Sequence, residues 1–470
     1  MKATTVSTKS ALITCIFLKS RTGSELHSLE MAEQLMSHGY EVTCFTLLSA
    51  YPIIDDFLEA GVRVVTFEQA DTLDDHYDLF FAQHHLVSDY VWNCLDISFD
   101  RVVVSVLGAA SEHELLPTFI ASADLAVFVS QECQDAYAEE LPRGLATMVL
   151  PNYASRAFFE LEPRKRPQSI ERIAVISNHT PAEVLGLRDV VPDGVDITYF
   201  GYESLSVPIT PQLLDSFDVV ISIGRTAQLC MATSTPFYCY DVFGGPGWLG
   251  LTSLKAHARQ NFSGRSDPTK RTSKELWEDL SHGYRHALLR LKPLRRFASQ
   301  SANLDLLVNR LLDRIASIKP VARTRSRAVA VKSRIACASL VKDYPYNEEF
   351  ATVQLFYGNR VDPCLEERSV LLRVRYNSLT TIHYQHVIPD NHDFYPLRLD
   401  PSLKPCACLM RTDNLLPTDQ TGRTDDGWDL LDVPDPSYAY SSELTNEQHQ
   451  QPLTFAVRPL ASTLRDTSGT

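Results

Sequence analysis

Short apolar runs that alternate with helical patterns constrain the fold of the first half of this chain more than any other feature. The strand-like runs are "ALITCIFL", "YEVTCFTL", "VRVVTF", "YDLFFAQ", "DRVVVSVLG" and "ADLAVFVS". Between the first two, apolar residues recur at helical spacing until Gly39 stops the pattern: Leu26, Leu29, Ala32, Leu35 and Met36. This alternation is typical of a parallel sheet with helices on both faces, so the first half is predicted to be α/β.

A second alternation follows a basic joint. The segment "EPRKRPQS" separates "MVLPNYASRAFF" from a new series, "ERIAVISNH", "ITYFG", "DVVISIG" and "FYCYDVF". We predict two facing Rossmann-like domains, one over 1–155 and one over 156–320, the second with closing helices between 271 and 318. Ligands of such sheets bind beyond the carboxyl ends of the strands, so the site is expected between the two domains.

The last part of the chain differs in texture. The stretch "ARTRSRAVAVKSR" is expected to be a solvated basic linker. Beyond it, short alternating runs such as "ATVQLFYG", "SVLLRVRY" and "TTIHYQHVI" are separated by Pro, Asn and Asp. They predict an accessory, mostly β domain over 336–470, built as a small antiparallel sandwich.

Charge and cysteine usage exclude several classes of partner. A net charge of -14 over 470 residues argues against nucleic acid, because a phosphate backbone requires a basic face. The ten cysteines are scattered and are typical of reduced cytosolic thiols. The apolar run at 11–18 is too short to span a membrane and lacks a cleavage pattern. We expect a cytoplasmic protein whose attachment to the inner face of a membrane, if any, is peripheral.

The stretch "DVVISIGRTAQLCMATSTPFYCYDVFGGPGWL" combines two glycine-bearing segments with a helix almost free of charge. It predicts a strand over Val219–Ser222 that ends at Gly224, followed by a helix that Thr226 caps and Pro236 ends. In "FGGPG", glycines would let backbone N–H groups approach a ligand. A strand, a glycine turn and a helix N-terminus form a common anion site. A plain strand–helix–strand unit is the alternative.

Several segments together resemble glycosyltransferases of the GT-B fold. "GSELHSLEMAEQLMSHGYEVTCFT" resembles their first loop and helix, especially in family four, and "VFVSQECQDAY" with "VLPNYASRAFF" is similar to the close of their first domain. "AVISNHTPAEV" and the stretch at 218–249 resemble a bacterial subset found in surface-polysaccharide contexts. "FYPLRLDPS" looks like an element of β domains appended to some glycan-synthesis proteins. The resemblance covers about residues 10–250.

The resemblance implies transfer of a sugar from a nucleotide-activated donor to a hydroxyl of a glycan or lipid-linked acceptor. In family four, the helix after the second-domain glycine turn carries a glutamate that binds the donor ribose; here Leu229 stands at that position and Ser234 replaces a glycine. Gln228 and the "YDVFGGPG" loop could bind the donor nucleotide in a different way. Arg225 beside the helix N-terminus would favour a diphosphate, and an exposed surface arginine is the alternative reading.

Candidate site residues follow from these positions. The donor-binding candidates are Asn178, His179, Gly201, Gly224, Arg225, Thr226, Gln228, Asp241, Gly244 and Gly245. The acceptor-side candidates, each near a strand end of the first domain, are Gly23, Ser24, Glu25 and His84.

Glu112 is the first choice for the group that activates the acceptor hydroxyl, because a carboxylate at a strand end can be desolvated towards a useful pKa, and His85 is the second. Helix caps and buried structural histidines are the alternatives for these residues and for Glu25. No Asp-x-Asp motif stands at a strand end of the α/β domains, and the acids near Asp425 and Asp432 read as turn residues, so neither a metal nor another cofactor is predicted.

Two rival functions share this architecture. One is a noncatalytic nucleotide- or glycan-binding protein that kept the fold after losing the donor glutamate. The other is a sugar-nucleotide epimerase. Turnover and binding with a panel of nucleotide sugars would separate them from a transferase.

Overall fold

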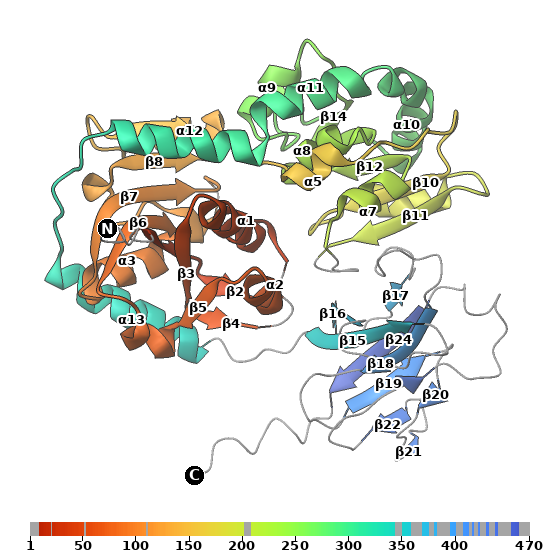
Figure 1. Cartoon of the computed structure of the whole chain (residues 1–470). Coiled ribbons are helices and arrows are strands. Elements are labelled where there is room, and N and C mark those ends of the chain that lie inside the picture. Colours follow the sequence, from red (N-terminus) through yellow and green to blue (C-terminus); the bar gives the residue numbers. More distant parts are fainter. Residues whose placement is uncertain are drawn as a thin grey trace, which may run out of the picture. The chain divides into compact units, whose positions relative to one another are not determined.

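The computed structural model describes residues 9–343, except 20, 51–52, 110 and 202–207, together with strands between residues 350 and 459. The chain forms two compact units, one with the first two large sheets and one with the strands beyond residue 350. Figure 1 shows their elements. The α/β class predicted for the first part is confirmed, because both of its large sheets are built on parallel strands flanked by helices.

The first sheet has seven strands in the order β5-β3-β1-β6-β7-β8-β9, and every adjacent pair is parallel. The strands are β1 (Lys9–Thr14), β3 (Tyr40–Thr46), β5 (Arg63–Thr66), β6 (His76–Gln83), β7 (Ser98–Val106), β8 (Leu125–Phe128) and β9 (Ala146–Val149). A small parallel pair joins β2 (Phe17–Leu18) to β4 (Leu48–Ser49). The strand order reverses between β1 and β6, where open α/β sheets bind ligands.

Helices cover both faces of the first sheet because successive strand residues point to opposite sides. Ala11 and Ile13 of β1 pack with α1 (Gly23–Ser37), α2 (Ile53–Glu59) and α12 (Leu304–Ser317). Leu12, between them, belongs to the core under α3 (His85–Cys94) and α13 (Arg327–Asp343). A shorter helix, α4 (Gln131–Ala136), follows β8.

The helices near residue 320 correct two predictions. Leu304, Leu307 and Leu311 of α12 lie in the core of the first sheet, so the predicted boundary at 320 assigns this helix to the wrong domain. The segment predicted as a solvated linker is also packed on the first sheet: the Arg323 guanidinium pairs with the buried Asp124 at 2.6 Å, and α13 packs on α3 (Figure 1). Its basic residues bind structural partners, which composition alone does not reveal. The rest of the predicted domain division stays a prediction.

The second sheet has five strands in the order β11-β10-β12-β13-β14. They are β10 (Arg172–Ile176), β11 (Asp196–Phe200), β12 (Val219–Ser222), β13 (Phe237–Asp241) and β14 (Gly244–Trp248). β12 is parallel to β10 and β13, whereas β14 runs antiparallel to β13. The accompanying helices are α5 (Arg156–Glu160), α6 (Ala182–Leu185), α7 (Pro211–Ser216), α8 (Arg225–Thr233), α9 (Leu254–Arg259), α10 (Ser273–Leu288) and α11 (Leu291–Ser301).

Helix α8 is nearly free of charge because it is enclosed. All residues from Ala227 to Thr233 are buried, and the helix contacts α5, α7 and α11 as well as the sheet. A charged side chain in that stretch would have to be desolvated without a partner.

The chain connects the first and second sheets twice, and the two crossings bond to each other: Ala154 N–H donates to Ala302 O at 2.8 Å, and Leu304 N–H donates to Ala154 O at 3.1 Å.

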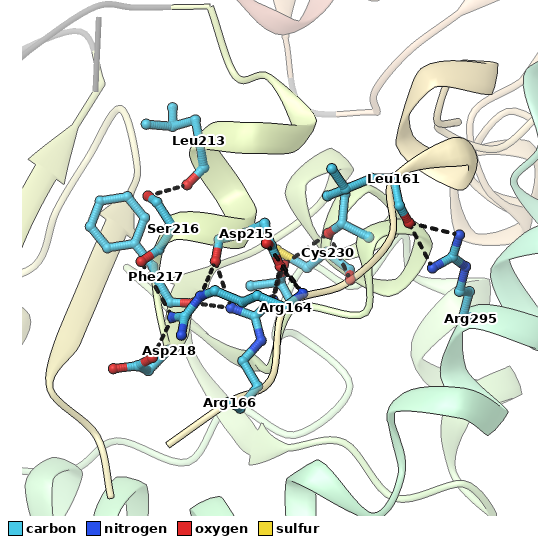
Figure 2. A network of polar contacts seen from close by, with 12 residues as sticks. Leu161, Arg164, Arg166, Leu213, Asp215, Ser216, Phe217, Asp218, Cys230 and Arg295 are labelled. Carbon is cyan, nitrogen blue, oxygen red and sulfur yellow. Dashed lines mark hydrogen bonds and ion pairs between the residues drawn. The ribbon is translucent and has the colours of Figure 1, made fainter. Parts of the chain in front are cut away.

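The basic joint after α5 is anchored to the amino-terminal edge of the second sheet (Figure 2). Arg164 pairs with Asp218, which directly precedes β12. Arg166 pairs with Asp215 at 2.6 Å and also donates to the Phe217 carbonyl. The Asp218 side chain, 1% exposed, accepts the N–H groups of Glu171 and Arg172 at 2.9 Å each. The joint is therefore part of the second domain's structure.

The described strands beyond residue 350 form antiparallel pairs. Its two five-stranded sheets have the orders β16-β15-β18-β23-β20 and β17-β24-β19-β22-β21. The strands are β15 (Phe350–Gly358), β16 (Ser369–Arg375), β17 (Thr380–Ile382), β18 (Tyr395–Asp400), β19 (Cys408–Thr412), β20 (Leu416–Pro417), β21 (Gly422–Arg423), β22 (Asp429–Leu431), β23 (Tyr438–Ala439) and β24 (Leu453–Pro459). The sandwich packing stays a prediction, and Asp425 and Asp432 lie outside the described residues.

Within the described part of the chain, no helix has both the length and the apolar character needed to cross a bilayer.

Candidate functional site

His84 occupies the carboxyl edge of the first sheet, at the point where the strand order reverses. It follows β6 with a φ of 62°, a left-handed conformation that is uncommon for a residue with a side chain. The Ile16 N–H, just after β1, donates to His84 Nδ1 at 3.0 Å, so the proton of the neutral ring lies on Nε2, 3.2 Å from Glu114 Oε1. Both ring nitrogens are thus engaged and the side chain is 4% exposed. His84 therefore links the segment after β1 to Glu114, and neither ring nitrogen is left for an acceptor.

His85, the first residue of α3, is arranged differently. Its ring is half-buried, and Nδ1–H donates to the His113 carbonyl at 3.3 Å. This leaves Nε2 as the nitrogen with a lone pair. Burial lowers the pKa of His85 below its ordinary 6.5, so the ring is neutral at physiological pH. A neutral imidazole with one oriented donor and one lone pair has the form of a general base.

The carboxylates after β7 do not match the prediction. Glu112 is exposed, so its carboxylate lacks the buried environment expected for it. Glu114, two residues later in the same 3₁₀ turn, is the buried one: Oε2 accepts the Leu107 N–H at 2.7 Å and Oε1 faces His84. The sequence placed both acids in one segment and contained no signal for which one turns inward.

Glu25 caps the first helix. It is the third residue of α1 and forms a capping box with Thr22, while its Oε1 also accepts the Lys19 N–H at 2.8 Å. Gly23 and Ser24 form the first turn of the same helix, and the Ser24 carbonyl accepts from Gln83 Nε2 at 3.1 Å. Glu25 is therefore a helix cap, the alternative role considered for it. Its carboxylate oxygens accept hydrogen bonds from the turn that precedes α1.

The carboxyl edge of the second sheet collects part of the predicted donor side. Asp241, at the end of β13, accepts two hydrogen bonds from Ser177 Oγ, at 3.0 and 2.9 Å, and Ser177 follows β10. Burial raises the pKa of Asp241. The His179 N–H donates to Ser177 Oγ at 3.0 Å, and the side chains of Asn178 and His179 are exposed. Polar groups from two strand ends thus meet here.

The start of α8 differs in detail from the prediction. Gly224, with a φ of 61°, is the N-cap, so Thr226 is the second helical residue and the predicted cap is wrong. Gln228 is buried, and its amide, with nitrogen toward the helix start, donates to Gly224 O at 2.6 Å and Arg225 O at 3.0 Å. The Gln228 amide group is therefore used in hydrogen bonds to the first turn of its own helix. Arg225 is the first residue of α8, next to the helix N-terminus as expected.

The "FGGPG" segment is a hairpin strand, not an open loop. Gly244 and Gly245 begin β14, and the Gly245 N–H donates to Thr269 O at 3.2 Å. A Cβ on Gly245 would lie 2.1 Å from Cys239 O, and one on Gly244 would lie 2.6 Å from Thr269 O. These glycines are required because backbone packs against them, and a Gly245→Val change would disturb the fold. Gly201, with a φ of 145°, follows β11 next to residues outside the description.

Arg225 also links the start of α8 to α1 of the first domain. Its Nη2 lies 2.5 Å from Oε1 of Glu30 in α1, and the two side chains are 18% and 12% exposed. Among the residues that the structure describes, Arg225 Nε, Arg225 Nη1 and Glu30 Oε2 are buried without a hydrogen-bond partner. Burial raises the pKa of Glu30, while Arg225 opposes that rise. The reading of Arg225 as a plain surface residue is thereby wrong.

His27 completes this junction. It is fully buried between Phe81 and Tyr153, and burial together with the nearby Arg225 guanidinium lowers its pKa to about 3. Within the described residues, neither ring nitrogen has a hydrogen-bond partner. Sequence reasoning singled out neither His27 nor Glu30, because both look like ordinary positions of an amphipathic helix.

Comparisons with known proteins give loose structural likenesses only. Neither the models of known protein families nor the curated proteins contain a match. HepE of Anabaena, solved with UDP and glucose, is 12% identical over 66% of this chain and 100% of HepE, with a TM-score of 0.46. A glycosyltransferase from Rickettsia africae is 12% identical over 65% of this chain and 97% of its own, with a TM-score of 0.42. Sucrose-phosphate synthase from Thermosynechococcus elongatus is 13% identical over 66% and 99%, with a TM-score of 0.41. Because these overlaps are loose, a function for this chain has to come from its own residues.

Proposed function

We propose that this chain is a glycosyltransferase of the GT-B fold that moves a sugar from a nucleotide-activated donor to a hydroxyl acceptor. The observation that carries the proposal is the partly buried junction in which Arg225, at the N-terminus of α8, reaches α1 of the first domain. Among the described residues, two of its guanidinium nitrogens have no hydrogen-bond partner. A guanidinium beside a helix N-terminus suits a diphosphate. The family-four character and a place in surface-polysaccharide synthesis are part of the proposal and are supported by the motifs at 10–250.

The chemistry assigns a task to each edge. The bond between the anomeric carbon and the diphosphate oxygen breaks, and its electron pair leaves with the diphosphate. Arg225 and the first N–H groups of α8 stabilise that growing charge. A bond forms between the anomeric carbon and the acceptor oxygen, while a base on the first domain takes the acceptor proton. His85 Nε2 suits this task because its lone pair is free of the Nδ1 hydrogen bond, and Glu112 is kept as the second candidate.

A noncatalytic nucleotide-binding protein is the second candidate function. It is favoured by Leu229, which stands where family four has a ribose-binding glutamate and is 3% exposed in the core of the second domain. Purified protein should be incubated with uridine and guanosine diphosphate sugars while both hydrolysis and melting temperature are followed. Transfer or slow hydrolysis of any donor supports the enzyme, whereas thermal stabilisation without turnover supports the binding protein. Neither effect with any donor would contradict both.

Arg225→Ala is expected to weaken binding of the nucleotide sugar by about 10- to 150-fold, because a lost charge-assisted hydrogen bond costs about 1.5–3 kcal/mol. Glu30→Gln should preserve or increase affinity, because it releases the guanidinium from its partner. The matched control is Arg265→Ala, which removes a more exposed pair with Glu132. Calorimetric titration measures all three variants. Equal affinities in Arg225→Ala and the Arg265→Ala control would remove Arg225 from the donor site.

The proposal needs no metal at the transfer site, because the arginine and the helix N-terminus supply positive charge. Turnover that is unchanged by a chelator would agree with this, and turnover that is abolished by a chelator and restored by a divalent ion would contradict it.

A cytoplasmic location is also proposed. Each of the seven cysteines whose surroundings are described is a free thiol, in keeping with a reducing compartment.

Peripheral attachment to an anionic membrane is proposed for α13. Val331 and Ile335 lie one turn apart on this helix and are 62% and 61% exposed, with the exposed Arg327 and Lys332 close in sequence. An apolar stripe bordered by basic residues is typical of helices that lie on anionic bilayers.

The β unit beyond residue 350 is proposed to be an accessory module that orients the enzyme on a growing glycan or a partner.

We expect the full chain to sediment with vesicles that contain phosphatidylglycerol, and less so as salt is raised. The double change Val331→Asp and Ile335→Asp should abolish sedimentation, because it places charge on the apolar stripe. Leu289→Asp is the control, since Leu289 is 80% exposed in the turn between α10 and α11. Equal sedimentation of all three proteins would exclude α13 as the attachment surface.

A further inference from the structure

His76, Asp78 and Asp100 gather at the amino-terminal edge of the first sheet, away from the carboxyl edge that carries the proposed transfer site. His76 and Asp78 begin β6 and point to the same face, because they are two positions apart. In the parallel register, His76 pairs with Ser98, and the neighbouring pairs Tyr77–Phe99 and Leu79–Arg101 place Asp78 beside Asp100. One potential ligand atom from each of the three residues lies within 4.8 Å of the others.

Hydrogen bonds fix the tautomer of His76. The Ser98 hydroxyl proton is directed at the Asp75 carbonyl at 3.2 Å, so Ser98 Oγ accepts from His76 Nδ1–H, at 2.9 Å. The neutral ring therefore has its lone pair on Nε2, and Nε2 lies 3.9 Å from Asp100 Oδ1. A lone pair thus faces a carboxylate oxygen, with a second carboxylate beside them.

Other bonds leave the cluster ready for a cation. Asp78 Oδ2 accepts from the Ser10 N–H and hydroxyl, at 2.7 and 3.2 Å, which orients Oδ1 as the other oxygen of that carboxylate. Arg323 donates to the Asp100 backbone carbonyl, and its guanidinium pairs with Asp124 and not with the Asp100 carboxylate. An imidazole whose second nitrogen donates to a neighbouring oxygen is the usual state of a metal-bound histidine.

We propose that His76, Asp78 and Asp100 bind a divalent transition cation of the Zn²⁺ class. One imidazole nitrogen and two carboxylates match the ligands that Zn²⁺ accepts in proteins, with water completing the coordination. Ligand atoms around Zn²⁺ are about 3.3 Å apart, so the side chains have to close by about an ångström. The exposure of His76 and Asp100 at the sheet edge permits this movement around the half-buried Asp78. The cation would neutralise two neighbouring carboxylates and join β6 to β7. This site is independent of the proposed sugar transfer.

The test is a titration of the full chain with ZnCl₂ at pH 7.5, where an ordinary histidine is neutral. His282 and His286, exposed and four residues apart on α10, could chelate Zn²⁺ themselves, so every protein carries His282→Ala and His286→Ala. We expect one equivalent of Zn²⁺ to bind and to raise the melting temperature. His76→Ala and Asp100→Asn should each weaken binding at least tenfold, and Ser98→Ala by about tenfold because the ring loses its orienting partner.

Asp71→Asn, an equal change of charge at a nearby exposed acid, is the matched control and should leave binding unchanged. Melting curves without metal check that each variant folds. Zn²⁺ affinity that is the same in His76→Ala as in its parent would overturn the site, and so would the absence of binding at pH 7.5. The rival explanation is that a proton on His76, paired with Asp100, balances the charge of the cluster. In that case the histidine signal would be the same with and without ZnCl₂, and the site would be overturned.

Discussion

His85→Ala is expected to lower the rate of sugar transfer by a factor of about 10² or more while donor affinity stays unchanged, because it removes the proposed base without touching the donor edge. The half-buried ring donates Nδ1–H to the His113 carbonyl, which leaves Nε2 for the acceptor proton. Burial lowers the pKa of His85, and the neutral form is the active one. The rate of the unaltered protein should therefore fall on acidification only below about pH 6.5, the ordinary pKa of histidine. Turnover as a function of pH, measured with donor affinity on the same preparation, provides the test.

Glu112→Gln is the companion variant because Glu112 is the other candidate base. Its exposed carboxylate predicts a smaller loss than that of His85→Ala. A large loss in Glu112→Gln with full turnover in His85→Ala would transfer the role of base to the carboxylate. Full turnover in both variants would remove the base from this edge of the first sheet. A lower melting temperature with an unchanged rate per folded molecule would identify a structural residue.

Asp218→Ala is expected to lower the free energy of unfolding by about 3–5 kcal/mol, the usual consequence of breaking a buried ion pair. Asp218 is 1% exposed, and its carboxylate binds the Arg164 guanidinium and the N–H groups of Glu171 and Arg172. Its removal leaves these donors unsatisfied at the amino-terminal edge of the second sheet, where Figure 2 shows Arg164 beside Asp218. Urea denaturation followed by circular dichroism measures the change.

Arg156→Ala is the control for this prediction. Arg156 and Glu160 form an i,i+4 pair whose side chains are 76% and 59% exposed, so its loss should cost at most about 1 kcal/mol. Donor affinity in Asp218→Ala, measured well below its melting temperature, should be unchanged because Asp218 lies at the edge opposite Asp241. If the urea midpoints of the two variants are alike, the joint after α5 is a simple tether.

The local pattern of the sequence determined the strands and the class of fold. The run at 218–222 contains β12, and the run at 11–18 contains most of β1 and, after a break, the short β2. Side-chain alternation and β-branched residues act over a few neighbours, which is why such runs are readable from sequence. The helix period over residues 26–36 likewise became α1. Parallel pairing followed from the order of the elements, since a helix between two strands returns the chain to the same edge of the sheet. The carboxyl-edge positions of His85, Arg225 and Asp241 could therefore be predicted.

Tertiary structure decided which of those groups are available for chemistry. His84 and His85 are adjacent in sequence, yet one is held by Ile16 and Glu114 and the other keeps a lone pair. Glu114 is buried and Glu112 is exposed for the same reason. A short turn can present either residue inward, and the partners Leu107 and His84 select Glu114.

The contacts that join distant segments were likewise beyond the reach of local pattern. Glu30 meets Arg225 across 195 residues, and Arg323 meets Asp124 across 199. Neither pair has a signal in its own neighbourhood, because an ion pair depends on where the backbone brings two charges and not on the residues beside each. The sequence by itself determined the elements and the edges at which chemistry could occur. Which side chains are buried, paired or free at those edges was decided by packing between elements that are far apart in the chain.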